Sequence, residues 1–110
     1  MIHEEVANDL RRAIEALDSA KRNLNEKDIF TAANRTFVAC ENAVYVLLKT
    51  TFGSSSISRI KILTKLSEIN SDAKRIYDDA YDLRVQADYG RKARLLPLTA
   101  ENVEIILQKV

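Results

Sequence analysis

The stretch DIFTAANRTFVACENAVYVLL, residues 28–48, decides the fold class of this chain. Its apolar side chains recur every three or four residues, and small residues widen the apolar face around much of the helix. Asp28 is suited to cap the first turn, and Gly53 is suited to end the helix in a left-handed conformation. Because so broad an apolar surface packs against several neighbours, we expect residues 28–51 to form the central helix of a bundle. The predicted stripe consists of Ala33, Phe37, Cys40, Val44, Leu47 and Leu48, widened by Ala32, Ala39, Ala43 and Val46.

The same periodicity predicts four more helices, and the chain has only two glycines and one proline to interrupt them. A short serine loop at 54–56 and a loop around Pro97 separate some of these helices. We therefore predict an all-α fold, an up-and-down bundle of about five helices, forming one domain over residues 1–110. The other helices are expected at about 4–24, 58–69, 72–89 and 100–109. Their inward stripes are expected to include Val6, Leu10, Ala13, Ile14, Leu17, Ala20 and Leu24 in the first of them, and Ile60, Leu63, Leu66 and Ile69 in the next.

Composition limits the classes of function that are open to this chain. Seventeen basic residues face sixteen acidic ones, and Asp78, Asp79 and Asp82 follow one another along one predicted helix. This balance argues against binding to duplex DNA. A single histidine and a single cysteine exclude a zinc site, and we expect no metal and no cofactor. The one cysteine and the absence of an apolar run of ~20 residues predict a cytoplasmic protein without a membrane span.

Polar residues interrupt the apolar stripes at two places. Asn34 and Glu41 are seven residues apart on one side of the central helix, and Arg84 and Asp88 are four apart near the end of the fourth. The first pair is either a polar edge or a partly buried patch that meets the fourth helix. In the second reading, Arg84 is the natural partner for Glu41. Arg84 and Asp88 can pair across one turn, yet Arg84 also lies on the stripe that carries Tyr81, so a phosphate site is the alternative to a simple salt bridge.

Two of these stretches resemble the HEPN domain family. Residues 28–48 are similar to the second helix of HEPN domains, and LRVQADYG, residues 83–90, resembles a prokaryotic branch with an Arg-x-x-Ala-Asp-Tyr-Gly-like signature. The resemblance covers nearly the whole chain and implies a compact helical domain that often forms a homodimer. It also implies either of two roles. Some members are metal-independent endoribonucleases, commonly toxins of toxin–antitoxin pairs, and many are paired with a minimal nucleotidyltransferase.

The catalytic members of that family carry a histidine shortly after the motif's arginine, and this chain departs from the pattern. Arg84 matches the arginine, but Tyr89 occupies the place of the histidine. A tyrosine with an ordinary pKa near ~10 is a poor base at neutral pH, and Asp88 could act as a base only if burial raised its pKa, which pairing with Arg84 would oppose. The sequence therefore favours a homodimeric interaction module, paired with a nucleotidyltransferase and carrying a degenerate phosphate or RNA site at Arg84 and Tyr81.

The alternative is an endoribonuclease that uses Arg84 with Asp88 or Tyr89 in place of the histidine. Asn34 and Glu41 would support the site in both readings. In some toxins of the family, the partner transfers nucleotides to a tyrosine near the motif. Modification of Tyr89 is therefore a further hypothesis, although its position does not match that tyrosine.

Overall fold

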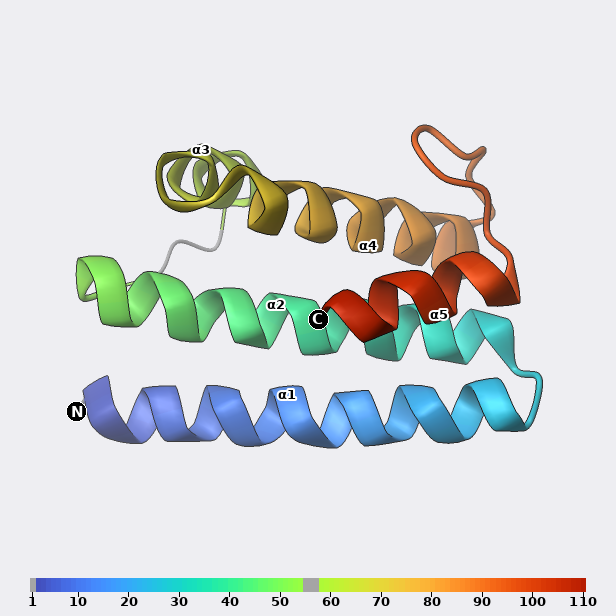
Figure 1. Ribbon diagram of the computed structural model, residues 1–110, viewed down its shortest axis with the longest axis horizontal. Helices are drawn as coiled ribbons and strands as arrows, with labels where there is room; N and C mark the ends of the chain where they lie inside the picture. Colours follow the sequence, from blue (N-terminus) through green and yellow to red (C-terminus); the bar gives the residue numbers. More distant parts are fainter. Residues whose placement is uncertain (1, 55–57) are drawn as a thin grey trace.

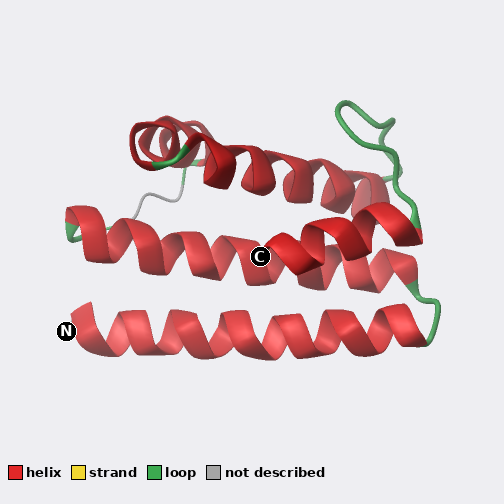
Figure 2. Cartoon of the chain, in the orientation of Figure 1, coloured by secondary structure: helices red, strands yellow, loops and turns green. Residues whose placement is uncertain are grey.

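A computed structural model describes residues 2–54 and 58–110, and within these ranges the chain forms a bundle of five helices without a strand (Figure 1, Figure 2). The all-α prediction is confirmed, and every predicted helix is present with bounds that differ by at most two residues. Helices α1, α2 and α4 run along the long axis in alternating directions (Figure 1). Helix α3 is seen nearly end-on and therefore crosses them. The helices are α1 (Ile2–Asn25), α2 (Ile29–Phe52), α3 (Arg59–Ile69), α4 (Ser71–Tyr89) and α5 (Ala100–Lys109).

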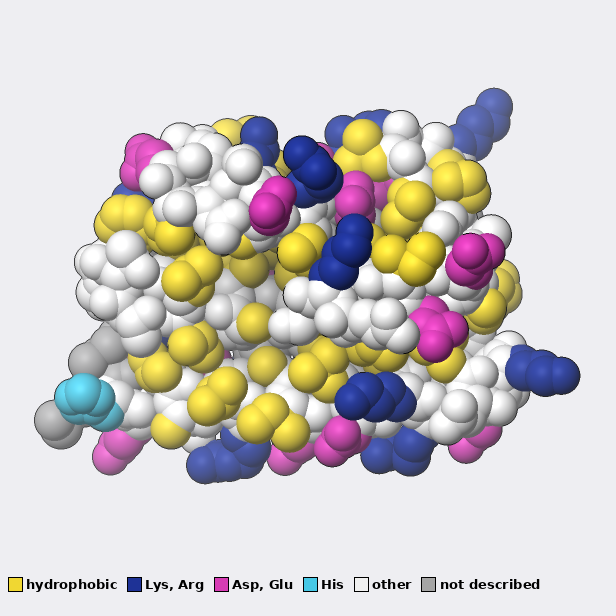
Figure 3. Space-filling model, in the orientation of Figure 1, with side chains coloured by type: hydrophobic (Ala, Val, Ile, Leu, Met, Phe, Trp, Pro, Cys, Tyr) yellow, Lys and Arg dark blue, Asp and Glu magenta, His cyan; other side chains and the backbone are white. Residues whose placement is uncertain are grey.

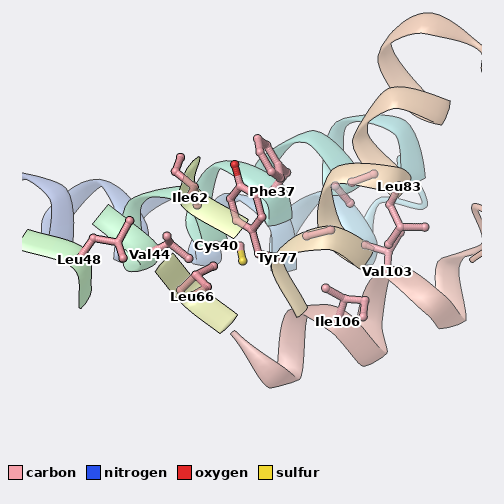
Figure 4. Packing of buried hydrophobic residues seen from close by; sticks show 13 residues of the cluster. Phe37, Cys40, Val44, Leu48, Ile62, Leu66, Tyr77, Leu83, Val103 and Ile106 are labelled. Carbon is pink, nitrogen blue, oxygen red and sulfur yellow. The ribbon is translucent and has the colours of Figure 1, made fainter. Parts of the chain in front are cut away.

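Helix α2 is the central element, as its composition predicts, because α1, α4 and α5 all pack against it. The core lies mainly between α2 and α4, and α3 and α5 close it at either end (Figure 4). The ring of Phe37 lies 5.5 Å from that of Tyr77 and 5.6 Å from that of Tyr81, measured between centroids. These tilted and edge-on contacts are favourable arrangements for aromatic pairs.

The ends of the helices carry specific capping contacts, and the two predicted ones, at Asp28 and Gly53, are confirmed. The Asp28 side chain accepts a hydrogen bond from the Thr31 amide, and Gly53 is left-handed, with φ 81°. Asn70 caps α4 through the amides of Asp72 and Ala73, and Thr99 caps α5. Of the predicted serine loop, Ser55 and Ser56 lie outside the described residues.

The inward face of α1 differs from the predicted stripe. Three alanines and Asp9 are buried against α2, whereas Leu10 and Ile14 are 50% and 52% exposed. Small side chains let the two helix backbones approach closely. The buried Asp9 forms an ion pair with Lys49 of α2, whose Nζ donates to Asp9 Oδ2 at 2.6 Å. The prediction that Leu10 and Ile14 face the core is therefore wrong. The buried alanines are Ala13, Ala16 and Ala20.

The predicted inward face of α3 is wrong at one position. Ile60 is 74% exposed, and Ile62 is buried in its place. A helix of eleven residues offers too few turns for its pattern to fix the phase of the apolar face. None of the helices in the described ranges is long and apolar enough to cross a membrane.

Candidate functional site

The contact between α2 and α4 brings together three of the residues singled out from the sequence. Asn34 donates a hydrogen bond from Nδ2 to Asp88 Oδ2 at 2.9 Å, and Arg84 Nε lies 3.1 Å from the same oxygen. Asn34 and Asp88 are 54 residues apart in sequence, so this polar patch does meet the fourth helix. Asn34 therefore reaches the fourth helix through a hydrogen bond that is exposed to solvent.

A second arginine braces the patch from α2. Arg35 donates to Asn34 Oδ1 from Nε at 3.1 Å and from a terminal nitrogen at 2.7 Å. With its carbonyl oxygen taken by Arg35, the Asn34 amide group is oriented to point its Nδ2 at Asp88. Arg35, Asn34, Asp88 and Arg84 thus form one connected network, in which Arg84 contacts the carboxylate directly and Arg35 is linked to it only through Asn34.

The guanidinium of Arg84 is held by an aromatic ring as well as by the carboxylate. Its Cζ lies 5.2 Å from the centroid of the Phe37 ring, which is within the range of a cation–π contact. The side chains of Arg84 and Asp88 remain 32% and 27% exposed, so their ion pair contributes only about 0.5 kcal/mol. The pair predicted from the four-residue spacing is present, and Arg84 lies at the surface of the bundle rather than within it.

Glu41 is half-buried on α2, and its hydrogen-bond partner is Tyr45, not Arg84. Burial raises the pKa of Glu41, although the hydrogen bond with Tyr45 and the positive charge of Arg84 both act to lower it. Burial and the neighbouring Glu41 in turn raise the pKa of Tyr45 to about 12. The expected direct partnership of Glu41 with Arg84 is therefore wrong, and the two interact only through their charges.

The two tyrosines of the predicted site lie in different surroundings. Tyr81 packs edge-on against Phe37, and the guanidinium of Arg59 lies 4.1 Å above its ring. Arg59 also forms an ion pair with Asp78. Tyr89, in contrast, is 63% exposed, and Arg91 stacks over it with its Cζ 5.6 Å from the ring centroid. Tyr81 therefore adjoins the Arg84 network through Phe37, whereas Tyr89 pairs with the following loop.

The sequence did not reveal a second polar network, which ties the 91–98 loop to α4. Asp82 is 1% exposed, and its carboxylate accepts backbone hydrogen bonds from Arg94, Leu95 and Leu96. Gln86 donates to the Leu96 carbonyl at 2.7 Å and accepts from the Leu98 amide at 2.9 Å. In the sequence, only the four-residue spacing of Asp82 and Gln86 points to this network. A pair of polar residues on a solvent-facing side of a helix has the same spacing. Asp82 is thus no part of an exposed acidic face.

The described residues contain no group of three or more His, Cys, Asp or Glu side chains placed to hold a metal ion. Next to the Asn34–Asp88 contact the surface forms a shallow, open hollow whose lining includes Phe30, Thr31 and Arg35. Neither a scan against models of known protein families nor a search of curated proteins finds a match for this sequence.

Proposed function

We propose that this chain is a HEPN-like interaction module that forms a homodimer and pairs with a minimal nucleotidyltransferase, as in toxin–antitoxin systems. One observation argues against a catalytic role for these residues. Asp88, the carboxylate nearest to Arg84, already accepts hydrogen bonds from both Arg84 and Asn34. Its Oδ2 atom is therefore already occupied by two donors and is not free to accept a proton from a substrate hydroxyl. The Arg84 network therefore serves to dock a partner or an anion.

The resemblance of residues 28–48 and 83–90 to HEPN domains supports the choice of partner, and the fold is compatible with it. The partly exposed Arg84 can still offer its terminal nitrogens to a phosphate or to a carboxylate of another protein. We place the phosphate or RNA contact of the module at Arg84, with Tyr81 beside it. The protein acts in the cytoplasm in this proposal and requires no cofactor.

Titration calorimetry with a purified minimal nucleotidyltransferase tests the pairing. We expect the wild-type chain to form a complex. Arg84→Ala should raise the Kd of this complex about tenfold, which is typical for the loss of one charged contact at an interface. Arg75→Ala is the matched control, because Arg75 is an exposed arginine on the same helix. No heat of binding with the wild-type chain, or equal weakening by the two substitutions, would contradict the proposed docking surface.

The second candidate is a metal-independent endoribonuclease, and Glu41 favours it. A carboxyl group with a raised pKa beside an arginine is a common arrangement for acid–base chemistry on phosphates. Glu41 would take the proton of the 2′-hydroxyl, whose oxygen attacks the phosphorus and displaces the 5′-oxygen, while Arg84 stabilises the phosphate charge. The departing 5′-oxygen would take its proton from water. Glu41 suits this role better than Asp88, which is held by two donors, or Tyr89, which packs with Arg91.

Cleavage of single-stranded RNA in EDTA decides between the two candidates. The interaction module predicts no cleavage by the purified wild-type chain. A nuclease predicts cleavage that both Arg84→Ala and Glu41→Gln abolish and that Arg75→Ala leaves intact. Activity that survives Arg84→Ala would point to a contaminating enzyme.

A further inference from the structure

Helix α1 carries a second apolar face beside the alanine face that packs on α2. Its residues recur with alternating spacings of three and four, the heptad pattern of a helix that packs lengthwise on another helix. Leu10 and Ile14, at its centre, are half-exposed. Figure 3 shows hydrophobic side chains gathered over α1 and α2 on the side turned to the viewer. We call this the outer face of α1: Ala7, Leu10, Ile14, Leu17 and Leu24, with the exposed Lys21 at the remaining position of the pattern.

The rest of the bundle covers only one end of this face. Helix α5 approaches the second half of α1 and leaves a groove of about 600 Å³ between them, lined by Leu17, Leu24 and Leu107 among others. The C-terminus of α5 lies near the middle of α2, and nothing in the described structure lies over the first half of α1 on this side (Figure 1). Contiguous exposed apolar surface of this kind marks an interaction site.

The charges that flank the outer face indicate its occupant. Arg11 and Asp18 are exposed and lie three residues before and four residues after Ile14. If two copies of α1 lie antiparallel, Arg11 of one copy comes beside Asp18 of the partner subunit, and symmetry repeats the pair. In a parallel arrangement the two copies of Arg11 lie on opposite flanks of the contact, as do the two copies of Asp18, so these charges would form no pair.

We propose that the outer face of α1 is the homodimer interface, packed antiparallel against the same helix of a second copy. This inference rests on the proposed function, since it names the surface through which the module would dimerise. The Arg84 network, which involves α2 and α4, would remain open to another partner. The dimer would therefore present two docking sites.

Charge reversal tests both the face and the orientation by sedimentation equilibrium of the full chain. We expect Arg11→Glu and Asp18→Arg each to raise the dimer Kd about 10- to 30-fold, because each turns two attractions into repulsions. The double variant restores both pairs and should return the Kd to within about threefold of wild type. Weakened dimers in both single variants without recovery in the double would overturn the antiparallel arrangement.

Substitution of the central apolar residue tests the face independently of charge pairing. Ile14→Glu should raise the Kd about 100-fold or more, since it places a charge in a buried apolar contact in both copies. Ile60→Glu is the matched control, because Ile60 is also exposed but lies on α3. Unchanged far-ultraviolet circular dichroism would show that both variants are folded.

Two outcomes separate this inference from the proposed function. A wild-type chain that stays monomeric at high micromolar concentration, or a dimer indifferent to Ile14→Glu, would overturn the interface even if a nucleotidyltransferase binds. A dimer that responds as expected, in a chain that binds no nucleotidyltransferase, would instead leave the interface standing and overturn the pairing.

Discussion

Replacing Asp82 tests whether the buried polar network holds the 91–98 loop on α4. The carboxylate accepts the Leu95 amide at 2.9 Å, the Leu96 amide at 3.0 Å and the Arg94 amide at 3.2 Å. Hydrogen bonds to a charged group contribute about 1.5–3 kcal/mol each. Arg94 and Leu95 are exposed, so their amides can bind water once the carboxylate is gone. We therefore expect Asp82→Ala to lower the free energy of unfolding by about 3 kcal/mol, less than the sum of the three bonds because two of the amides regain hydrogen bonds to water.

Thermal unfolding followed by circular dichroism measures this loss. A change of about 3 kcal/mol corresponds to a fall in Tm of about 12 °C for a domain of this size. Asp82→Asn keeps the shape of the side chain and one acceptor oxygen, and should lose about half as much. Asp79→Asn is the control on the same helix. Burial and the charge of Asp78 raise the pKa of Asp79, so removal of its charge should not lower Tm.

Limited trypsin digestion reports on the loop itself, which contains Arg91, Lys92 and Arg94. If Asp82 anchors this loop, Asp82→Ala should speed cleavage after these residues well below the new Tm. A loss of less than about 1 kcal/mol, within the range of an ordinary surface substitution, would refute the reasoning. So would a fall in Tm without faster cleavage in the loop, because stability would then be lost elsewhere.

Three further predictions concern single positions. Glu41→Gln should raise the free energy of unfolding at pH 7, because the folded state raises the pKa of Glu41. This gain should shrink as the pH falls through that pKa toward the usual carboxyl range, and a gain that persists in acid would contradict it. Gly90→Ala should cost about 1 kcal/mol in urea unfolding, since Gly90 ends α4 at φ 64°, and no loss would show that the turn accepts a side chain. Cys40 is 4% exposed and burial raises its pKa to about 12, so Ellman's reagent should react with it only on unfolding.

The sequence predicts the helices of this chain well because their ends carry specific chemical signals. Asp28 and Thr99 cap the starts of α2 and α5, and Gly53 and Gly90 end α2 and α4 in left-handed conformations. These are local preferences of single residues and depend little on the rest of the fold. The prediction of α2 as the central helix also holds, because its apolar surface is too broad for a single neighbour.

The direction in which α1 faces could not be predicted in the same way. Its alanines and its leucines recur at helical spacing on adjoining faces, and hydrophobicity alone favours the larger side chains for the core. In the fold the alanines face α2, because small side chains let the two long helices pack closely. This packing depends on the whole fold and cannot be read from the pattern of α1 alone. The same limit applies to the site. The Arg84–Asp88 pair lies within one helix and was predictable, whereas the choice of Tyr45 by Glu41 and the loop contacts of Asp82 depend on how separate segments meet.

The alanine face of α1 also has a consequence for how this sequence can change over time. Ala13, Ala16 and Ala20 leave no room for a larger side chain without moving α1 away from α2. Such a movement would displace Leu10 and Ile14 on the adjoining face as well. Mutational drift along α1 should therefore be confined to its remaining polar face, and a change at an alanine should persist only with a compensating change in α2.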